Sequence, residues 1–308
     1  MINKKENYFK RLGKDLCKNK GLYLMLLPIV LYYLVFCYFP MYGAQIAFRD
    51  FRPRLGITGS KWVGLENFIA FFNGIYFKRL VRNTLLINVL NLVIGFPAPI
   101  ILALLLNEVR NVRFKRTIQT ISYLPHFIST VVIAGMILQF VSTDGFITNI
   151  LTTFGLPQKN LLTIPSMFRP IYITSEIWQG IGWSSIIYIA AITGINPELY
   201  EAAKIDGAGR LKQVLNVTIP GIMPTIITMF ILRVGSMMSL GYEKIILLYN
   251  SSIYETADVI SSYVYRKGLL DLDYSYGSAV DLYNSVINLV LLISANKICK
   301  KLTDNSLW

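Results

Sequence analysis

Polar side chains inside otherwise apolar stretches are the residues of this chain that could do chemistry. Amides, tryptophans and a few ionisable groups recur within long uncharged segments or at their ends. Such groups are unfavourable in hydrocarbon unless they face another helix or a water-filled cavity. Where they face a cavity, they offer hydrogen bonds and flat aromatic surfaces to a solute. In chain order, the candidates are Asn88, Asn91, Gln139, Trp178, Gln179, Trp183, Arg233, Tyr242, Glu243, Tyr283, Asn284 and Asn288.

Packing between helices is the alternative role for each candidate. Asn88 and Asn91 lie three residues apart and would share one helix face, which favours a contact between helices. Trp178 fits an anchor at the membrane interface as well as it fits a pathway. Arg233 differs, because a guanidinium inside a membrane protein needs a partner or water. We expect it to form an internal ion pair or to line a cavity.

The sequence contains no motif for catalysis by the chain itself. It lacks the GxxxxGK[ST] pattern that holds ATP phosphates, and it lacks HExxH and GxSxG. A single histidine, His126, makes neither a metal site nor a catalytic triad, and we expect it to hydrogen-bond to a neighbouring helix. Cys17, Cys37 and Cys299 have no metal or disulfide spacing. We therefore expect neither enzymatic activity, nor a metal, nor a cofactor in this chain.

The segment 194–220 carries the clearest local signals in the chain. Asn196 is a favourable N-cap and Pro197 suits the first helical position, so a short helix should begin there. Gly207 should end it. The residues between them are small and mildly apolar on one side, and the charges are balanced, which favours docking into a groove over binding lipid or phosphate. A second helix is predicted over 210–217.

Six apolar segments are long enough to position these residues inside a membrane. The chain is 54% hydrophobic and only 15% charged, with a mean hydropathy of +0.50. A spanning helix needs about 20 mostly apolar residues. The predicted spans are 21–39, 84–106, 119–141, 174–194, 219–240 and 279–297. Residues 1–20 and 301–308 would flank a membrane domain at 21–300, whose loop 195–220 joins the fourth and fifth spans. The expected fold is all-α and polytopic.

The basic residues support a membrane topology rather than nucleic-acid binding. The formal net charge is +13, but the basic residues mostly flank the apolar segments. With the N-terminus in the cytoplasm, 17 Lys and Arg fall in cytoplasmic segments and 12 in outer segments. This bias agrees with the positive-inside rule and places both termini in the cytoplasm. The outer loop 40–83 still holds seven basic residues, for which the sequence offers no clear explanation.

A resemblance to a known family rests on the loop. Glu201-Ala202-Ala203, then Gly207, then Ile219-Pro220 resemble the signature of permeases of binding-protein-dependent importers of the ATP-binding-cassette class, whose pattern is E-A-A, three residues, G, nine residues, I-x-L-P. Val217 and Ile219 stand at the Ile and Leu positions. Further stretches are similar to the sugar-importing branch, and within it to permeases for complex, including pectin-derived, oligosaccharides. These stretches are 62–68, 83–84, 123–129 and 178–183, and the resemblance as a whole covers roughly residues 20–300.

This resemblance implies a type I importer permease fold in the bacterial plasma membrane. It also implies that the loop is a coupling helix seated in a groove of an ATPase subunit. The implied partners are a second, homologous permease, two copies of a cytoplasmic ATPase that binds ATP and Mg²⁺, an extracellular sugar-binding lipoprotein, an oligosaccharide and membrane lipid. A heterodimer of permeases is expected. The implied coupling residues are Asn196, Pro197, Glu198, Tyr200, Glu201, Ala202, Ala203, Asp206, Gly207 and Ala208.

The expected function is alternating access for an oligosaccharide, with the polar candidates above along half of its pathway. A permease of the same class for another solute is an alternative. A six-span channel or secondary transporter is another, although no inverted repeat or filter-like loop is visible. A membrane enzyme would need acid, base or metal ligands inside the spans, and none stands out.

Overall fold

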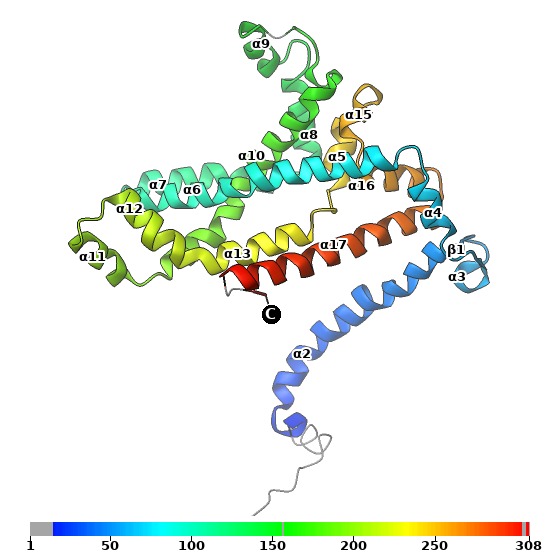
Figure 1. Cartoon of the computed structure of the whole chain (residues 1–308), viewed down its shortest axis with the longest axis horizontal. Coiled ribbons are helices and arrows are strands. Elements are labelled where there is room, and N and C mark those ends of the chain that lie inside the picture. Colours follow the sequence, from blue (N-terminus) through cyan, green and yellow to red (C-terminus); the bar gives the residue numbers. More distant parts are fainter. Residues whose placement is uncertain (1–14, 156, 304–305, 308) are drawn as a thin grey trace, which may run out of the picture.

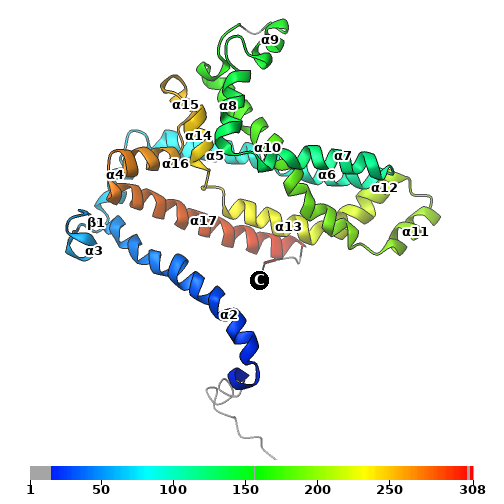
Figure 2. The same ribbon diagram turned by 180° about the vertical axis from the view of Figure 1, so that it is seen from behind.

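The computed structural model describes residues 15–155, 157–303 and 306–307 and is mostly helical. Long helices lie side by side along the longest axis, with α11 at one end of that axis and α4 near the other (Figure 1). Viewed from behind, α2 leaves this bundle and extends away from it (Figure 2). Most of the predicted segment 1–20, and residues 304, 305 and 308 of the predicted tail, lie outside the described residues.

The first span is longer than the predicted 21–39. Helices α2 (Lys20–Tyr33), η1 (Leu34–Tyr38) and η2 (Phe39–Phe48) continue into one another over 29 residues. The most apolar stretch of this helix has no buried residue, so its side chains are left for lipid or another chain to cover. Only its end, at η2, packs closely on α17.

A small antiparallel ribbon follows the first span, in the otherwise helical chain. Strands β1 (Arg49–Asp50) and β2 (Lys61–Trp62) pair, with α3 (Gly56–Gly59) in the connection between them, and α4 (Glu66–Phe72) follows. The Phe48 and Trp62 rings stack 5.6 Å apart. The Asn67 amide donates to the Ala47 carbonyl oxygen at 2.9 Å, which ties α4 to the end of the first span.

The predicted span 119–141 is two helices rather than one. After the second span, formed by α5 (Phe77–Leu90), η3 (Asn91–Gly95) and α6 (Pro97–Glu108), the chain enters α7 (Val112–Tyr123) and η4 (Leu124–Phe127). Helix α8 (Thr130–Phe140) follows at an angle of 101°. Pro125 lacks an amide donor, Ile128 and Ser129 adopt extended backbone, and the Ser129 hydroxyl caps α8, so the helix restarts in a new direction.

Helix α10 (Pro165–Thr193) contains the predicted fourth span and is the central element of the bundle. It follows α9 (Phe146–Thr153) and η5 (Leu161–Thr163), and it packs on α6, α7 and α13. A Cβ at Gly182 would collide with the backbone carbonyl of Ser122, so only glycine allows α10 to approach the third span this closely.

The predicted fifth span ends at Gly235 rather than at 240. Helix α11 (Pro197–Ile205) leads through α12 (Arg210–Gln213) and η6 (Val214–Thr218) into α13 (Ile219–Gly235). After a break, the chain forms short elements and then one long final helix. These are α14 (Tyr242–Leu248), η7 (Ser251–Ile253), α15 (Tyr254–Ala257), α16 (Ile260–Val264), η8 (Tyr265–Leu270) and α17 (Tyr274–Thr303).

Four helices of the described chain are long and apolar enough to cross a membrane, and five if the bent pair counts as one span. They are Lys20–Phe48, Phe77–Glu108, Arg210–Gly235 and Tyr274–Thr303. Helix α10 is long enough but is not among these four, and it carries Arg169, Glu176 and Gln179. The length and composition of the helices therefore give a multi-pass protein without establishing six spans.

Candidate functional site

Local sequence signals position the ends of α11. The Asn196 Oδ1 atom accepts a hydrogen bond from the Glu198 backbone amide at 3.0 Å, and Pro197 is the first helical residue. Gly207 has a φ of +75°, a conformation that suits glycine. Its amide donates to the Lys204 carbonyl at 3.0 Å, and the Ala208 amide donates to the Ala203 carbonyl at 2.8 Å. These two bonds form a Schellman motif, so the predicted helix start and glycine stop are confirmed.

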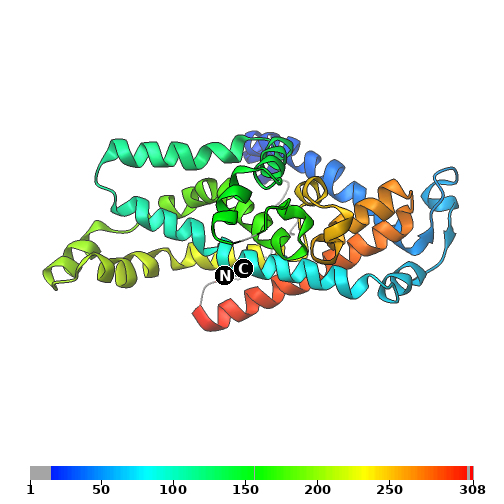
Figure 3. The ribbon, with the colours of Figure 1, turned by 90° about the horizontal axis from the view of Figure 1, so that it is seen from above.

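Two large apolar side chains of α11 are exposed. The Leu199 side chain is 53% exposed and that of Ile205 is 87% exposed. Only Tyr200, Ala203 and Ala208 among the predicted coupling residues are half-buried; Asn196, Pro197, Glu198, Glu201, Ala202, Asp206 and Gly207 are exposed. Seen from above, this helix lies at the far end of the molecule (Figure 3). A protruding helix with an apolar face and a well-defined shape is suited to seating in another protein.

One hydrogen bond attaches α11 to the start of the next long helix. The Tyr200 hydroxyl lies 3.0 Å from the Thr218 hydroxyl, and Thr218 is buried. The Gln213 side-chain amide also donates to the Ala208 carbonyl at 2.7 Å. These contacts hold α11 against α12 and η6, so the connection from α10 to α13 is an ordered element rather than a loose loop.

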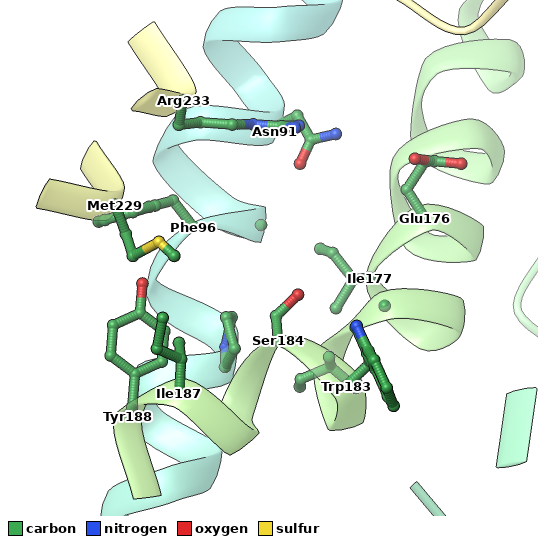
Figure 4. Close-up of a pocket in the computed structure, with 14 residues that line it drawn as sticks. Asn91, Phe96, Glu176, Ile177, Trp183, Ser184, Ile187, Tyr188, Met229 and Arg233 are labelled. Carbon is green, nitrogen blue, oxygen red and sulfur yellow. The ribbon is translucent and has the colours of Figure 1, made fainter. Parts of the chain in front are cut away.

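A cavity of about 460 Å³ lies between the second span, α10 and α13. Figure 4 shows Glu176 on α10 facing Asn91 and Arg233 across it. A second space of about 380 Å³ shares Ile187 and Met229 with the first and continues between α10 and α13. The lining residues of the first are Asn91, Gly95, Phe96, Pro99, Glu176, Ile177, Gly180, Ile181, Trp183, Ser184, Ile187, Tyr188, Met229 and Arg233.

Three of the predicted pathway residues meet in this cavity: Asn91, Trp183 and Arg233. The Trp183 ring is stacked on His126, with centroids 4.6 Å apart, so the histidine packs on α10 by its ring. None of the side-chain hydrogen bonds found in the described chain involves His126, which differs from the expected polar contact. Arg233 is exposed and makes no ion pair with any residue that the structure describes.

The cavity wall also contains an ion pair that the sequence did not suggest. The Lys244 Nζ atom lies 2.7 Å from the Glu176 Oε1 atom and 2.9 Å from the Gln179 Oε1 atom. Lys244 is only 4% exposed. It reaches α10 from α14, so Gln179 is held next to the cavity although it does not line it. The two ionic partners are 68 residues apart in sequence, and no local pattern links them.

The predicted residues of the second, third and fourth spans include three that the structure places away from the cavity lining. Trp178 lines a separate, almost wholly apolar cavity of about 390 Å³ between α8, α9 and α10. Asn88 is buried and donates to the Thr84 carbonyl within its own helix. Gln139 is exposed on α8.

The remaining five predicted residues, on α14 and α17, also lie outside the cavity lining. Tyr242 stacks on Tyr265, and Glu243 is exposed. Tyr283 packs in an aromatic cluster with Phe71, Phe72 and Phe77. Asn284 is buried, with its Oδ1 atom unpaired among the described residues. Asn288 accepts from the Met238 amide at 2.8 Å and donates to the Ser239 hydroxyl at 2.7 Å, which fixes the break after α13.

A buried carboxylate, that of Asp258, binds residues from several elements. Asp258 is fully buried and pairs with Arg79 at 3.0 Å and with Arg266 at 2.8 Å. Burial lowers the pKa of the Arg266 guanidinium, but hydrogen bonds to Tyr249 and Asp258 more than offset this, so its pKa is raised overall. Arg79, one of the seven basic residues of the predicted loop 40–83, is therefore paired with Asp258 inside the protein.

Comparisons with known proteins agree over most of the chain. Residues 95–295 match the family described as binding-protein-dependent transport system inner membrane component. The chain is 45% identical over 309 residues to the polygalacturonan/rhamnogalacturonan transport system permease protein YteP of Bacillus subtilis (strain 168), with 100% of this chain and 96% of the relative covered.

Two crystal structures have closely similar chains. One is a bacterial ABC transporter involved in the import of the acidic polysaccharide alginate, with a TM-score of 0.86 and 44% identity over 95% of this chain and 99% of that chain. The other is the bacterial alginate ABC transporter in complex with alginate pentasaccharide-bound periplasmic protein, with a TM-score of 0.87 and 43% identity over 96% of this chain and 100% of that chain. The sequence presented here belongs to the family of inner-membrane components of binding-protein-dependent transport systems.

Proposed function

We propose that this chain forms half of the membrane pathway of an oligosaccharide importer and that α11 couples this pathway to ATP hydrolysis. The chain is a multi-pass permease subunit with the type I importer fold, and it acts with a sugar-loaded binding protein. It pairs with a second, homologous permease. ATP and Mg²⁺ are bound by two copies of a cytoplasmic ATPase, so the chain itself catalyses no reaction.

The connection of α11 to the cavity supports this function most directly. Helix α11 joins α10 to the segment that becomes α13, and both of these helices line the cavity. A displacement of α11 by an ATPase would therefore move two walls of the cavity together. Alternating access needs such a connection, because ATP shifts the equilibrium only through contacts that differ between the two states.

The topology that we propose has six spans, with both termini in the cytoplasm. The bent pair of α7, η4 and α8 is the third span and α10 is the fourth; the four more apolar helices supply the rest. Glu176 of α10 lines the cavity and binds Lys244 of α14, and Arg169 donates to Asn83 of α5, so these charged groups have protein partners, as a spanning helix requires. Membership of the family favours an importer over the channel and the secondary transporter left open by the sequence.

Replacing Ala202 with tryptophan tests the coupling role. Ala202 is exposed on α11, so the substitution should leave the chain folded and paired while preventing a close fit in an ATPase groove. We expect oligosaccharide uptake into proteoliposomes, and sugar-stimulated ATP hydrolysis, to fall at least tenfold in the complex reconstituted with its ATPase, second permease and binding protein.

The matched control is Val112→Trp, which adds the same bulk at an exposed position of another predicted cytoplasmic connection. We expect this variant to keep uptake within about twofold of the wild type, in line with the small effects of most surface substitutions. Uptake that is unchanged in an assembled Ala202→Trp complex would remove α11 from the coupling pathway. Failure of the purified chain to bind any ATPase would overturn the importer assignment.

A further inference from the structure

We propose that Arg233 binds the carboxylate of an acidic sugar in the cavity and so makes the pathway selective for uronate-containing oligosaccharides. This inference rests on the proposed function, because it assumes that the cavity lies on the sugar pathway. It identifies Arg233 as the residue that would bind the carboxylate. It also explains why Arg233 has no ionic partner among the described residues of the cavity, since Lys244 pairs with Glu176.

The charges at the cavity wall leave one cation uncompensated. Glu176 and Arg233 are the only lining residues that carry a full charge at neutral pH. Lys244 neutralises Glu176 at 2.7 Å from outside the cavity and is too deeply buried to serve another anion. Arg233 has no ionic partner among the described residues. The cavity therefore has a net charge of about +1 in its resting arrangement, by this simple accounting.

The chemistry of Arg233 fits a carboxylate better than a hydroxyl. A guanidinium offers paired N–H groups that match the two oxygens of a carboxylate, and such charge-assisted bonds are stronger than neutral ones. A cation within a membrane protein is unfavourable without a counter-charge or water, so an anionic ligand would relieve that cost. A neutral sugar would offer the guanidinium only hydroxyl oxygens.

The surrounding residues suit the rest of a sugar ring. Asn91 and Ser184 provide hydrogen-bonding groups, and the Trp183 indole, which stacks on His126 on one side, also lines the cavity (Figure 4). An amide, a hydroxyl and a flat ring are the groups expected for a sugar with many hydroxyls and an apolar face. The similar proteins described above are named for polygalacturonan and for the acidic polysaccharide alginate, which agrees with a carboxylate-bearing ligand.

The test compares an acidic oligosaccharide with a neutral form of the same size. The complete complex is reconstituted in proteoliposomes with its binding protein, and uptake of trigalacturonate is compared with that of its methyl ester at saturating concentrations. Arg233→Gln should lower the uptake rate of the acid at least tenfold and that of any transported ester by no more than twofold. The same binding protein serves both variants, so its own preference cancels in the ratio.

A binding measurement makes the result independent of the binding protein. Equilibrium dialysis of trigalacturonate against the purified permease–ATPase complex should give a Kd at least tenfold weaker for Arg233→Gln, with part of the affinity retained by Arg233→Lys. Arg82→Gln is the matched control, because Arg82 is an exposed arginine that does not line the cavity, and it should bind like the wild type.

The outcomes separate the inference from the proposed function. Equal losses for acid and ester, or unchanged binding of trigalacturonate by Arg233→Gln, would assign Arg233 a structural role, such as pairing with the second permease, and would overturn the inference alone. A wild-type complex that shows no sugar-stimulated ATP hydrolysis and no uptake of any oligosaccharide would overturn the proposed function as well.

Discussion

Lys244 supplies the counter-charge of the Glu176 carboxylate. Lys244 approaches from α14 and binds both Glu176 and Gln179, so one ammonium satisfies two acceptors of α10. Since the lysine is buried and the carboxylate is partly exposed, the pair joins the short helix α14 to the cavity wall. Without the lysine, the charge of Glu176 would offset that of Arg233 on the facing wall, and the cavity would be neutral overall.

Lys244→Met should therefore destabilise the protein. Glu176 would lose its counter-charge and Gln179 one donor, which we expect to lower stability by roughly 1–3 kcal/mol. Thermal unfolding of the purified complex measures the loss. The double variant Lys244→Met with Glu176→Gln should recover part of it, because a neutral amide needs no counter-charge. Glu243→Gln, at the exposed neighbouring position, is the control. A double variant no more stable than the single one would contradict an energetic link between the two residues.

At the scale of elements, the end of α11 depends on one backbone conformation. Gly207 reverses the chain with a positive φ, and its two neighbouring hydrogen bonds close the helix. Gly209 follows two residues later with an ordinary φ of −67°. A Cβ at either glycine would meet no atom within 4 Å, so the two positions differ in backbone conformation and not in space.

This difference predicts a large effect of substitution by alanine at Gly207 and a small effect at Gly209. Gly207→Ala forces a side chain into the left-handed region, at a cost of roughly 1–2 kcal/mol, and should loosen α11. We expect sugar-stimulated ATP hydrolysis to fall several-fold and hydrogen exchange in α11 to rise. Gly209→Ala should change both by little, because alanine tolerates its conformation. Equal effects of the two substitutions would mean that the shape of this turn does not matter for coupling.

At the scale of the whole molecule, the end opposite α11 is held together by buried charge. Asp258 binds Arg79 of α5 and Arg266 of η8, while the Asn83 side chain donates to the Asp258 carbonyl and accepts from Arg169 of α10. Three parts of the chain that are distant in sequence, α5, α10 and the segment from Asp258 to Arg266, thus meet around Asp258. The ends of α11 are instead fixed by hydrogen bonds between residues close in sequence, such as Ala208 to Ala203. The two ends of the molecule are therefore stabilised by different kinds of contact.

Removing the charge of Asp258 should weaken the packing of the elements that meet around it. Asp258→Asn leaves two guanidiniums without their anion, and loss of one member of a buried ionic cluster typically costs about 3–5 kcal/mol. Asp271→Asn is the control, because its pair with Lys267 is exposed and worth less than about 1 kcal/mol. Thermal unfolding should separate the two variants clearly. Similar midpoints for both would show that the buried cluster contributes little to stability.

Features that depend on neighbouring residues could be predicted from the sequence, and those that depend on distant residues could not. The start and stop of α11 follow from Asn196, Pro197 and Gly207, which act within a few residues of one another. The bend between η4 and α8 also has a local cause in Pro125, but its angle of 101° depends on how the chain packs afterwards. The bounds of the spans shifted because caps and breaks, rather than hydropathy, end a helix.

The cavity shows the same limit. Apolar patterning placed Asn91, Trp183 and Arg233 inside the membrane, and the structure places them at one cavity. The same reasoning could not separate them from Asn88 or Asn288, whose polar groups bond within a helix or fix a turn. Nor could it find Lys244, since a lysine outside the predicted spans gives no signal of its partner on α10.

The tight contact between Gly182 and the Ser122 carbonyl limits how α10 can move. This helix has 29 residues and a length of about 44 Å, and the contact with the Ser122 carbonyl lies near its middle. A rigid helix that tilted about this contact would move its two ends in opposite directions. A tilt of about 5° would carry each tip roughly 2 Å, given that length. The point about which α10 would tilt is thus set by Gly182, which has no Cβ.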